Sequence, residues 1–162
     1  RRAAAQWRSR IEDKRLSLDI DCLDGIYCRG DLSAVVKMLG SLISNSVKFT
    51  EINGSLHIRA RHCGDRIAIY VADNGRGIDQ QALLRVGGPF EQNAAVMENG
   101  MKGSGLGLAI TRGLVDLLGG ALRIRSRPGI GTIVMICLPR AETHGLSKAA
   151  EEKLISHRQS AA

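Results

Sequence analysis

Apolar and polar residues alternate in several short stretches of this 162-residue chain, as they do in half-buried β-strands. The candidate strands are residues 16–22, 26–28, 55–61, 66–72 and 121–127. Residues 132–138 (TIVMICL) are apolar at nearly every position, which predicts a strand in the interior of a sheet. The short segment before Arg66 predicts a hairpin, and Pro128-Gly129 predicts a type II turn.

Two longer stretches have the period of an amphipathic helix. The first follows Asp31 or Ser33 as a candidate N-cap, and the second ends at Gly119-Gly120. Their apolar stripes are expected to contain Val35, Leu39, Leu42 and Ser46, and Leu106, Ile110, Leu114 and Leu117. The order of strands and helices predicts one α/β domain, a two-layer sandwich with helices on one face of a mixed sheet.

Three polar residues share a second side of the first helix. At about 100° per residue, Ser41, Asn45 and Lys48 project together, away from the apolar stripe. An asparagine oxygen suits a Mg²⁺ that already has phosphate and water ligands, and a lysine can contact the same phosphates. An asparagine on a helix is, taken alone, more often simply solvated.

Glycines cluster at two places, residues 73–78 (DNGRGI) and 103–107 (GSGLG). The second cluster begins a helix, where unpaired N–H groups and the helix dipole favour an anion. It is neither a P-loop, which needs Lys and Ser or Thr after its last glycine, nor a dinucleotide fingerprint, which needs a preceding strand. Each cluster alone is also compatible with an ordinary turn or hinge.

Asp73 stands at the end of a strongly apolar strand. A carboxylate there is unfavourable unless a donor satisfies it, and the exocyclic amine of adenine is a suitable donor.

Composition excludes several other classes of protein. The net charge of +7 is spread along the chain and only five residues are aromatic, so nucleic-acid binding is not expected. The four cysteines match no zinc spacing, and no apolar run approaches the roughly 18 residues that span a bilayer. We expect a cytoplasmic domain, with membrane anchoring of a longer protein left open.

Five segments in chain order resemble the sequence boxes of a histidine-kinase catalytic and ATP-binding domain. They are residues 41–50 (SLISNSVKFT), 73–78, 89–92 (PFEQ), 103–110 (GSGLGLAI) and 119–139. This family belongs to the superfamily of gyrase, heat-shock chaperones and mismatch-repair ATPases. The resemblance covers about residues 16–139. It implies a Bergerat-type ATP-binding fold, with a mostly antiparallel sheet and an ATP lid at residues 84–102.

The resemblance also implies roles for individual residues. Asn45 matches the asparagine that holds Mg²⁺, Lys48 the lysine near the phosphates, and Asp73 the aspartate that reads adenine. The remaining expected nucleotide contacts are Gly75 and Gly77, which make room for the base, then Ile78, then Phe90 in the lid, and the phosphate loop of Gly103, Ser104, Gly105, Leu106 and Gly107.

The implied activity is transfer of the γ-phosphoryl group of Mg-ATP to a histidine on a separate helical dimerisation domain, with a response regulator downstream. None of the chain's four histidines stands in a His-Glu context on an amphipathic helix, so we expect the acceptor to lie outside this chain. Residues 1–15 are then expected to be a linker from that domain, and residues 140–162 a polar tail. A homodimer is expected only for the full-length protein.

Departures from the family pattern leave alternatives open. Family members often have Asn at the position of Ser41 and Ala at that of Ser46, and this lid has few basic residues, with only Lys102 after the PFEQ segment. A nucleotide-binding regulatory module (a pseudokinase) and a serine-kinase relative acting on a partner protein remain alternatives. ATP-hydrolysing relatives carry a glutamate at the position of Ser41, so its absence is evidence against a hydrolase.

Overall fold

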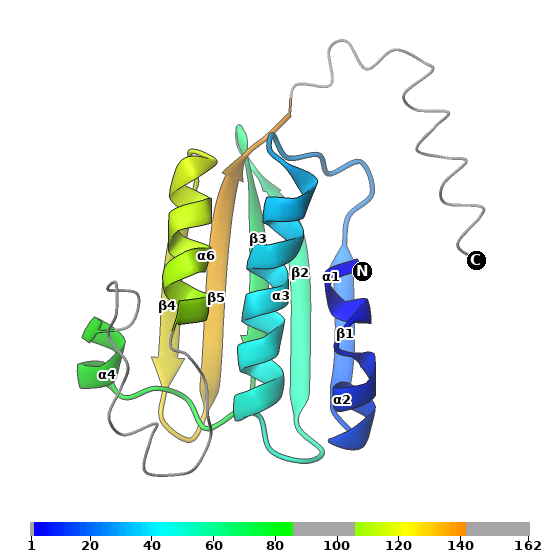
Figure 1. The fold of residues 1–162 in the computed structure, drawn as a ribbon, viewed down its shortest axis with the longest axis vertical. Helices are drawn as coiled ribbons and strands as arrows, with labels where there is room; N and C mark the ends of the chain where they lie inside the picture. Colours follow the sequence, from blue (N-terminus) through cyan, green and yellow to red (C-terminus); the bar gives the residue numbers. More distant parts are fainter. Residues whose placement is uncertain (1, 86–105, 142–162) are drawn as a thin grey trace.

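A five-stranded sheet forms one layer of the computed structural model, which describes residues 2–85 and 106–141, with side chains over 2–83 and 107–141. The strands are β1 (Ser17–Cys22), β2 (Ser55–Cys63), β3 (Arg66–Asp73), β4 (Ala121–Arg127) and β5 (Gly131–Pro139). Their order is β1-β2-β3-β5-β4, and β1 pairs with β2 in parallel while all other pairs are antiparallel. The interior position predicted for residues 132–138 is confirmed (Figure 1).

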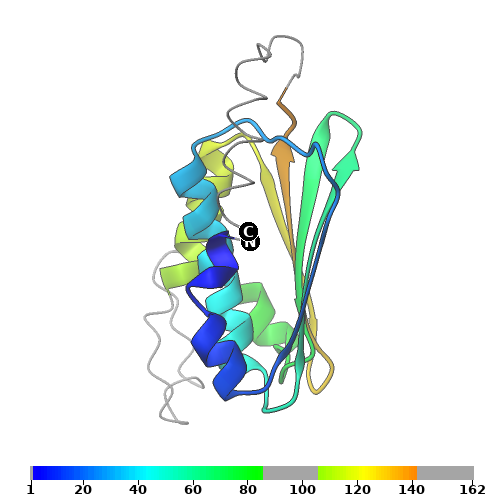
Figure 2. The same ribbon diagram turned by 90° about the vertical axis from the view of Figure 1, so that its right-hand side faces the viewer.

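Helices form the second layer, on one face of this sheet. They are α1 (Arg2–Ala5), α2 (Arg8–Asp13), α3 (Leu32–Phe49), α4 (Gln80–Arg85) and α6 (Leu106–Leu117). Figure 2 shows the described helices on one side of the strands and the other face of the sheet without a helix. The expected two-layer sandwich with a mixed, mostly antiparallel sheet is therefore confirmed. No helix within the described ranges is long and apolar enough to cross a membrane.

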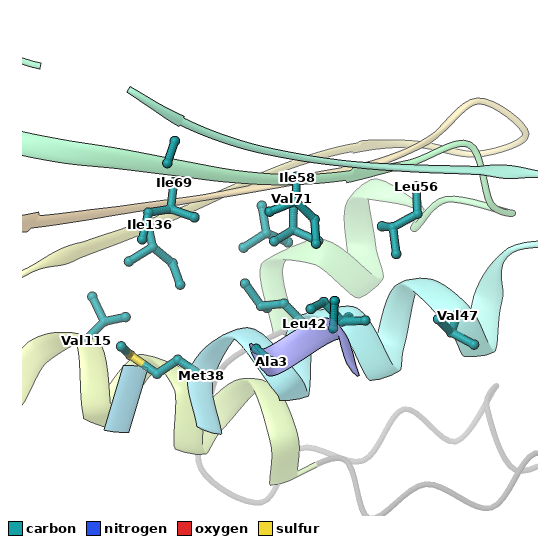
Figure 3. Packing of buried hydrophobic residues seen from close by; sticks show 14 of the residues in the cluster. Ala3, Met38, Leu42, Val47, Leu56, Ile58, Ile69, Val71, Val115 and Ile136 are labelled. Carbon is teal, nitrogen blue, oxygen red and sulfur yellow. The ribbon is translucent and has the colours of Figure 1, made fainter. Parts of the chain in front are cut away.

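The core lies between α3, α6 and the inner face of the sheet. Figure 3 shows Met38 and Leu42 of α3 directed toward Ile58, Val71 and Ile136 of the strands. Met38, Val71 and Ile136 are each only 1% exposed, and Leu42 is 2% exposed. Because the helices and strands place aliphatic side chains on facing surfaces, the core needs almost no aromatic residues.

The caps and turns follow local sequence. Asp31 is the N-cap of α3 and accepts a hydrogen bond from the Ala34 N–H at 2.9 Å. Hydrogen bonds from the Ser33 hydroxyl and that N–H hold the pKa of the Asp31 carboxyl below its usual value. The turn at Pro128-Gly129 closes with an Ile130 N–H to Arg127 carbonyl bond of 3.1 Å, and Gly129 has the positive φ of 72° that a type II turn requires.

Two sequence-based predictions were wrong. Residues 26–28 form no strand, because only a single bridge joins Cys28 to Arg140. Of the apolar stripe expected on α6, Leu114 packs against the core, but Ile110 is 55% and Leu117 83% exposed, so the stripe as a whole does not face the core. The buried side instead contains Thr111 and Val115, with Leu108, Leu114 and Leu118 partly buried beside them.

The misplaced stripe has a physical cause. Helix α6 carries apolar residues around most of its circumference, so periodicity alone does not select one face. Thr111 is tolerated in the core because its hydroxyl donates to the Gly107 carbonyl at 2.8 Å.

The N-terminal segment packs against α3. Ala3, Ala4 and Ile11 are 5–6% exposed and belong to the main hydrophobic cluster. The ammonium group of Lys14 donates to the carbonyls of Lys48 and Thr50, at 3.1 and 2.7 Å, at the C-terminal end of α3. Helices α1 and α2 therefore contribute side chains to the core of this domain.

Candidate functional site

The carboxylate of Asp73 connects the end of β3 to helix α3. Its Oδ2 accepts a hydrogen bond of 2.7 Å from the hydroxyl of Ser46, and its Oδ1 accepts one of 3.1 Å from the Gly75 N–H. Ser46 is only 5% exposed, whereas Asp73 is partly buried. Each carboxylate oxygen has two lone pairs, so Asp73 retains capacity for a further donor such as the amine of adenine.

Asn45 and Lys48 lie on the last turns of α3, the helix that also supplies Ser46. Both side chains are partly buried. Because Asn45 directly precedes Ser46, the Ser46–Asp73 hydrogen bond brings the backbone of the candidate metal ligand close to the candidate adenine-reading carboxylate. The structure thus brings together residues that lie 28 positions apart in the sequence.

Arg76 is a charged residue of this region that sequence reasoning missed. Its guanidinium lies 4.5 Å from the centroid of the Phe49 ring, and the Lys48 ammonium lies 5.0 Å from the same centroid. The Arg76 N–H also donates to the Phe49 carbonyl at 3.1 Å. The only available signal was its position between Gly75 and Gly77, which indicates a loop residue but not a partner.

The segment that follows Asp73 is fixed to three other parts of the domain. The Asn74 side-chain oxygen accepts from the Ser55 N–H at 2.7 Å. The Ile78 N–H donates to the Ser126 hydroxyl at 2.8 Å, and the Gly129 N–H donates to the Arg76 carbonyl at 2.8 Å. The start of β2, the end of β4 and the β4–β5 turn therefore determine where this loop lies.

The two glycines of this loop are required by the fold itself. A Cβ on Gly75 would lie 2.5 Å from the Phe49 carbonyl oxygen, and one on Gly77 would lie 2.1 Å from that of Arg127. Gly77 also has a positive φ of 70°, which favours glycine. Close packing of the chain explains both residues, and their predicted role in making room for a base stays a prediction.

Gly107 lies in the first turn of α6, next to α3. A Cβ on Gly107 would lie 2.7 Å from the Ser41 hydroxyl, so this glycine permits close approach of the two helices. Leu106 begins α6, and Phe90, Gly103, Ser104 and Gly105 lie outside the described residues. The predicted lid, residues 84–102, starts in the last turn of α4 and otherwise also lies outside them.

The donor set fits a magnesium ion that arrives with a nucleotide. Among the described residues, no group of three His, Cys, Asp or Glu side chains could hold a metal by itself. Asn45 would supply one neutral oxygen, and phosphates and waters would supply the other ligands, which is a common arrangement for Mg²⁺.

Comparison with known proteins identifies the family. The sequence profile described as "Histidine kinase-, DNA gyrase B-, and HSP90-like ATPase" matches residues 30–142. The chain is 40% identical over 136 residues to the "Non-motile and phage-resistance protein" of Caulobacter vibrioides, covering 82% of this chain and 16% of that protein. It is 33% identical over 135 residues to the "Circadian input-output histidine kinase CikA" of Synechococcus elongatus, covering 83% of this chain and 18% of that protein.

A solved structure supports the fold. The catalytic domain of histidine kinase ThkA has a TM-score of 0.75 and 20% identity to this chain, and the match covers 86% of this chain and 90% of that domain. The chain spans less than a fifth of the length of the two curated relatives above. It belongs to the histidine kinase-, DNA gyrase B- and HSP90-like ATPase family, as a catalytic ATP-binding domain of the histidine-kinase type.

Proposed function

We propose that this domain binds Mg-ATP and transfers the γ-phosphoryl group to a histidine on a separate helical dimerisation domain. The observation that carries the proposal is the 2.7 Å hydrogen bond between Ser46 and Asp73. This bond connects the helix of Asn45 and Lys48 to the carboxylate that suits adenine. Both ends of one nucleotide would then contact the same part of the domain.

Each residue has a distinct role in this proposal. Asp73 accepts a hydrogen bond from the adenine amine with the lone pairs that Ser46 and Gly75 leave available. Asn45 ligates the Mg²⁺ that accompanies the phosphates, and Lys48 contributes positive charge beside them. The bound magnesium would neutralise phosphate charge. Phosphoryl transfer depends mainly on such positioning and charge neutralisation.

The chemical step requires an acceptor from another domain. An imidazole nitrogen attacks the γ-phosphorus, the bond to the bridging oxygen of the β-phosphate breaks, and ADP leaves with that oxygen. Ser41 stands opposite the first turn of α6 and has no carboxylate that could activate water. Slow hydrolysis of bound ATP is therefore part of the proposal.

The context of the domain is also a proposal. We expect the phosphorylated histidine to pass its phosphoryl group to a response regulator, and the domain to act in the cytoplasm as part of a homodimeric protein. Relatives that are named as histidine kinases support the kinase context, and this chain matches only 18% and 13% of the length of two of them.

The test combines this domain with γ-labelled ATP, Mg²⁺ and a histidine-bearing helical hairpin from the same full-length protein. Acid-labile label on the hairpin histidine is the expected result, and the matched hairpin with that histidine replaced by glutamine should remain unlabelled. An Asn45→Ala variant should bind adenosine normally but lose Mg²⁺-dependent affinity for ATP. Saturable ATP binding without transfer would contradict the kinase proposal and favour a regulatory module.

A further inference from the structure

The face of the sheet opposite the helices carries a row of arginines. Arg123, Arg125 and Arg127 alternate along the edge strand β4, and all three are exposed. The residues between them, Leu122, Ile124 and Ser126, are partly buried on the helix side. Alternate residues of a strand are about 7 Å apart, so the row extends over about 14 Å. Figure 2 shows this face without a covering helix.

These arginines have no carboxylate partner within the described part of the chain. On β5, Arg123 is paired in register with Met135 and Arg125 with Ile133, and neither neighbour is charged. The ion pairs that the structure shows lie at the other edge of the sheet, between Asp19 and His57 and between Asp21 and Arg61. Three like charges side by side repel one another, so an acidic partner would relieve an unfavourable arrangement.

An open groove of about 440 Å³ adjoins this row. Ala72, Ile130 and Ile133 contribute apolar surface to it, and Arg125 and Arg127 flank it. Ile130 is 66% and Ile133 46% exposed, so two large aliphatic side chains lie uncovered beside the arginines. Asp73 and Asn74 also line this groove, at the end of β3. The Asp73 carboxylate is hydrogen-bonded to Ser46 of α3, on the helix side of the sheet, so the groove and the proposed nucleotide site share Asp73 but lie on opposite faces of the sheet.

We propose that this face docks an acidic, amphipathic segment of a partner protein. An apolar side chain of the segment would enter the groove over Ile133, and carboxylates on either side would pair with the arginines. The groove is open rather than enclosed, and the arginine row continues past it to Arg123. A segment of several residues can contact both features, whereas a small anion would contact one or two arginines.

The proposal can be tested by nuclear magnetic resonance with the acetylated and amidated peptide EELFEE as the probe. Saturable shifts should be confined to the amides of Ala72, Arg125, Ile133 and their neighbours, and raised salt should weaken the binding. The peptide KKLFKK should cause no such shifts. EEGGEE, which lacks the apolar side chains, should bind at least about tenfold more weakly, a loss typical of removing one buried apolar side chain.

Variants separate specific docking from general attraction to a basic protein. Arg125→Glu/Arg127→Glu should weaken binding of EELFEE by at least about tenfold, because repulsion replaces two charge-assisted contacts. Arg8→Glu/Arg29→Glu makes the same change of net charge at exposed residues outside this face and should retain the affinity. Ile133→Ser provides an independent test of the groove and should also weaken binding.

Three results would overturn the proposal. They are the absence of saturable shifts on this face, an equal loss of affinity in the Arg8→Glu/Arg29→Glu control, and binding of pyrophosphate at the same residues with an affinity matching that of EELFEE. The last result would identify a site for small anions. Calorimetry with ATP should give the same affinity in the Arg125→Glu/Arg127→Glu variant as in the parent, so failure of the docking site is distinguishable from failure of the nucleotide site.

Discussion

The hydrogen bond from Ser46 to Asp73 affects how both residues respond to substitution. The Ser46 hydroxyl is buried and donates to the Asp73 carboxylate, so both groups have a hydrogen-bond partner without a ligand. From the sequence, Asp73 was expected to need adenine as its donor. The structure shows that the protein already supplies two donors, Ser46 and the Gly75 N–H, and this changes how substitutions should behave.

Replacing Asp73 by asparagine should abolish ATP binding while lowering the free energy of unfolding of the ligand-free protein by less than about 1 kcal/mol. The amide oxygen can still accept from Gly75, and the Ser46 hydroxyl can rotate to accept from the amide nitrogen. Asp73→Ala should cost about 1–3 kcal/mol, because it leaves the Ser46 hydroxyl buried without a partner. Calorimetry and urea unfolding measure the two effects. Unfolding of ligand-free Asp73→Asn would show that the carboxylate is mainly structural.

Ser46→Ala tests the other partner of this hydrogen bond. The variant removes one of the two donors that orient the Asp73 carboxylate. We expect ATP affinity to fall about fivefold, which corresponds to about 1 kcal/mol for one hydrogen bond. Because the Gly75 N–H still holds the other carboxylate oxygen, binding should be weakened rather than lost. Unchanged affinity would mean that the Gly75 N–H alone orients the carboxylate.

Gly77 and Gly129 allow the effect of positive φ to be separated from that of a steric contact. Both have positive φ, 70° and 72°, but a Cβ on Gly129 would meet nothing within 4 Å, whereas one on Gly77 would meet the Arg127 carbonyl. Gly129→Ala should therefore cost only the conformational penalty of about 1–2 kcal/mol. Gly77→Ala should cost about 1–3 kcal/mol more, from the steric contact. Equal losses in urea unfolding would contradict this explanation of Gly77.

Among the helices, strands and turns, the sequence predicted the features that depend on residues close together in the chain. The cap at Asp31, the hairpin between β2 and β3 and the type II turn before β5 all follow from local chemistry. The face that α6 buries did not, because Ile110 and Val115 are equally apolar and only packing against α3 and the sheet selects between them. The short stretch at 26–28 had strand character, but it makes just one bridge, to Arg140.

Lys14 connects the end of α2 to the end of α3, a contact that no pattern in the local sequence indicates. Its ammonium group caps the C-terminal end of α3, which is the end that carries Lys48. Lys14→Met keeps the aliphatic part of the side chain and should lower the free energy of unfolding by about 1 kcal/mol, with faster amide exchange in the last turn of α3. Lys37→Met, at an exposed position of the same helix, is the control and should change neither quantity. Equal effects of the two variants would exclude a capping role.

In the whole molecule, the order of the family's sequence motifs along the chain predicted the fold class. The position of the candidate site, in contrast, depends on which strands pair in the sheet. Asp73 reaches Ser46 because β3 lies in the middle of the sheet, under α3. That placement depends on β5 pairing between β3 and β4, which joins residues far apart in the chain. Contacts between residues far apart in the sequence, such as that of Arg76 with the Phe49 ring, were therefore not predictable from the neighbouring sequence.

Helix α2 packs within the domain. Residues 1–15 were predicted to be a linker, but Ile11 is 6% exposed within the main core cluster. Ile11→Ala should therefore lower the free energy of unfolding by about 2–5 kcal/mol, as truncation of a core isoleucine does. Ile52→Ala, at a position that is 62% exposed, should change it by less than about 0.5 kcal/mol. If urea unfolding gave the same small change for both variants, α2 would be a detachable linker. A large difference would make α2 part of the cooperative unit that contains α3.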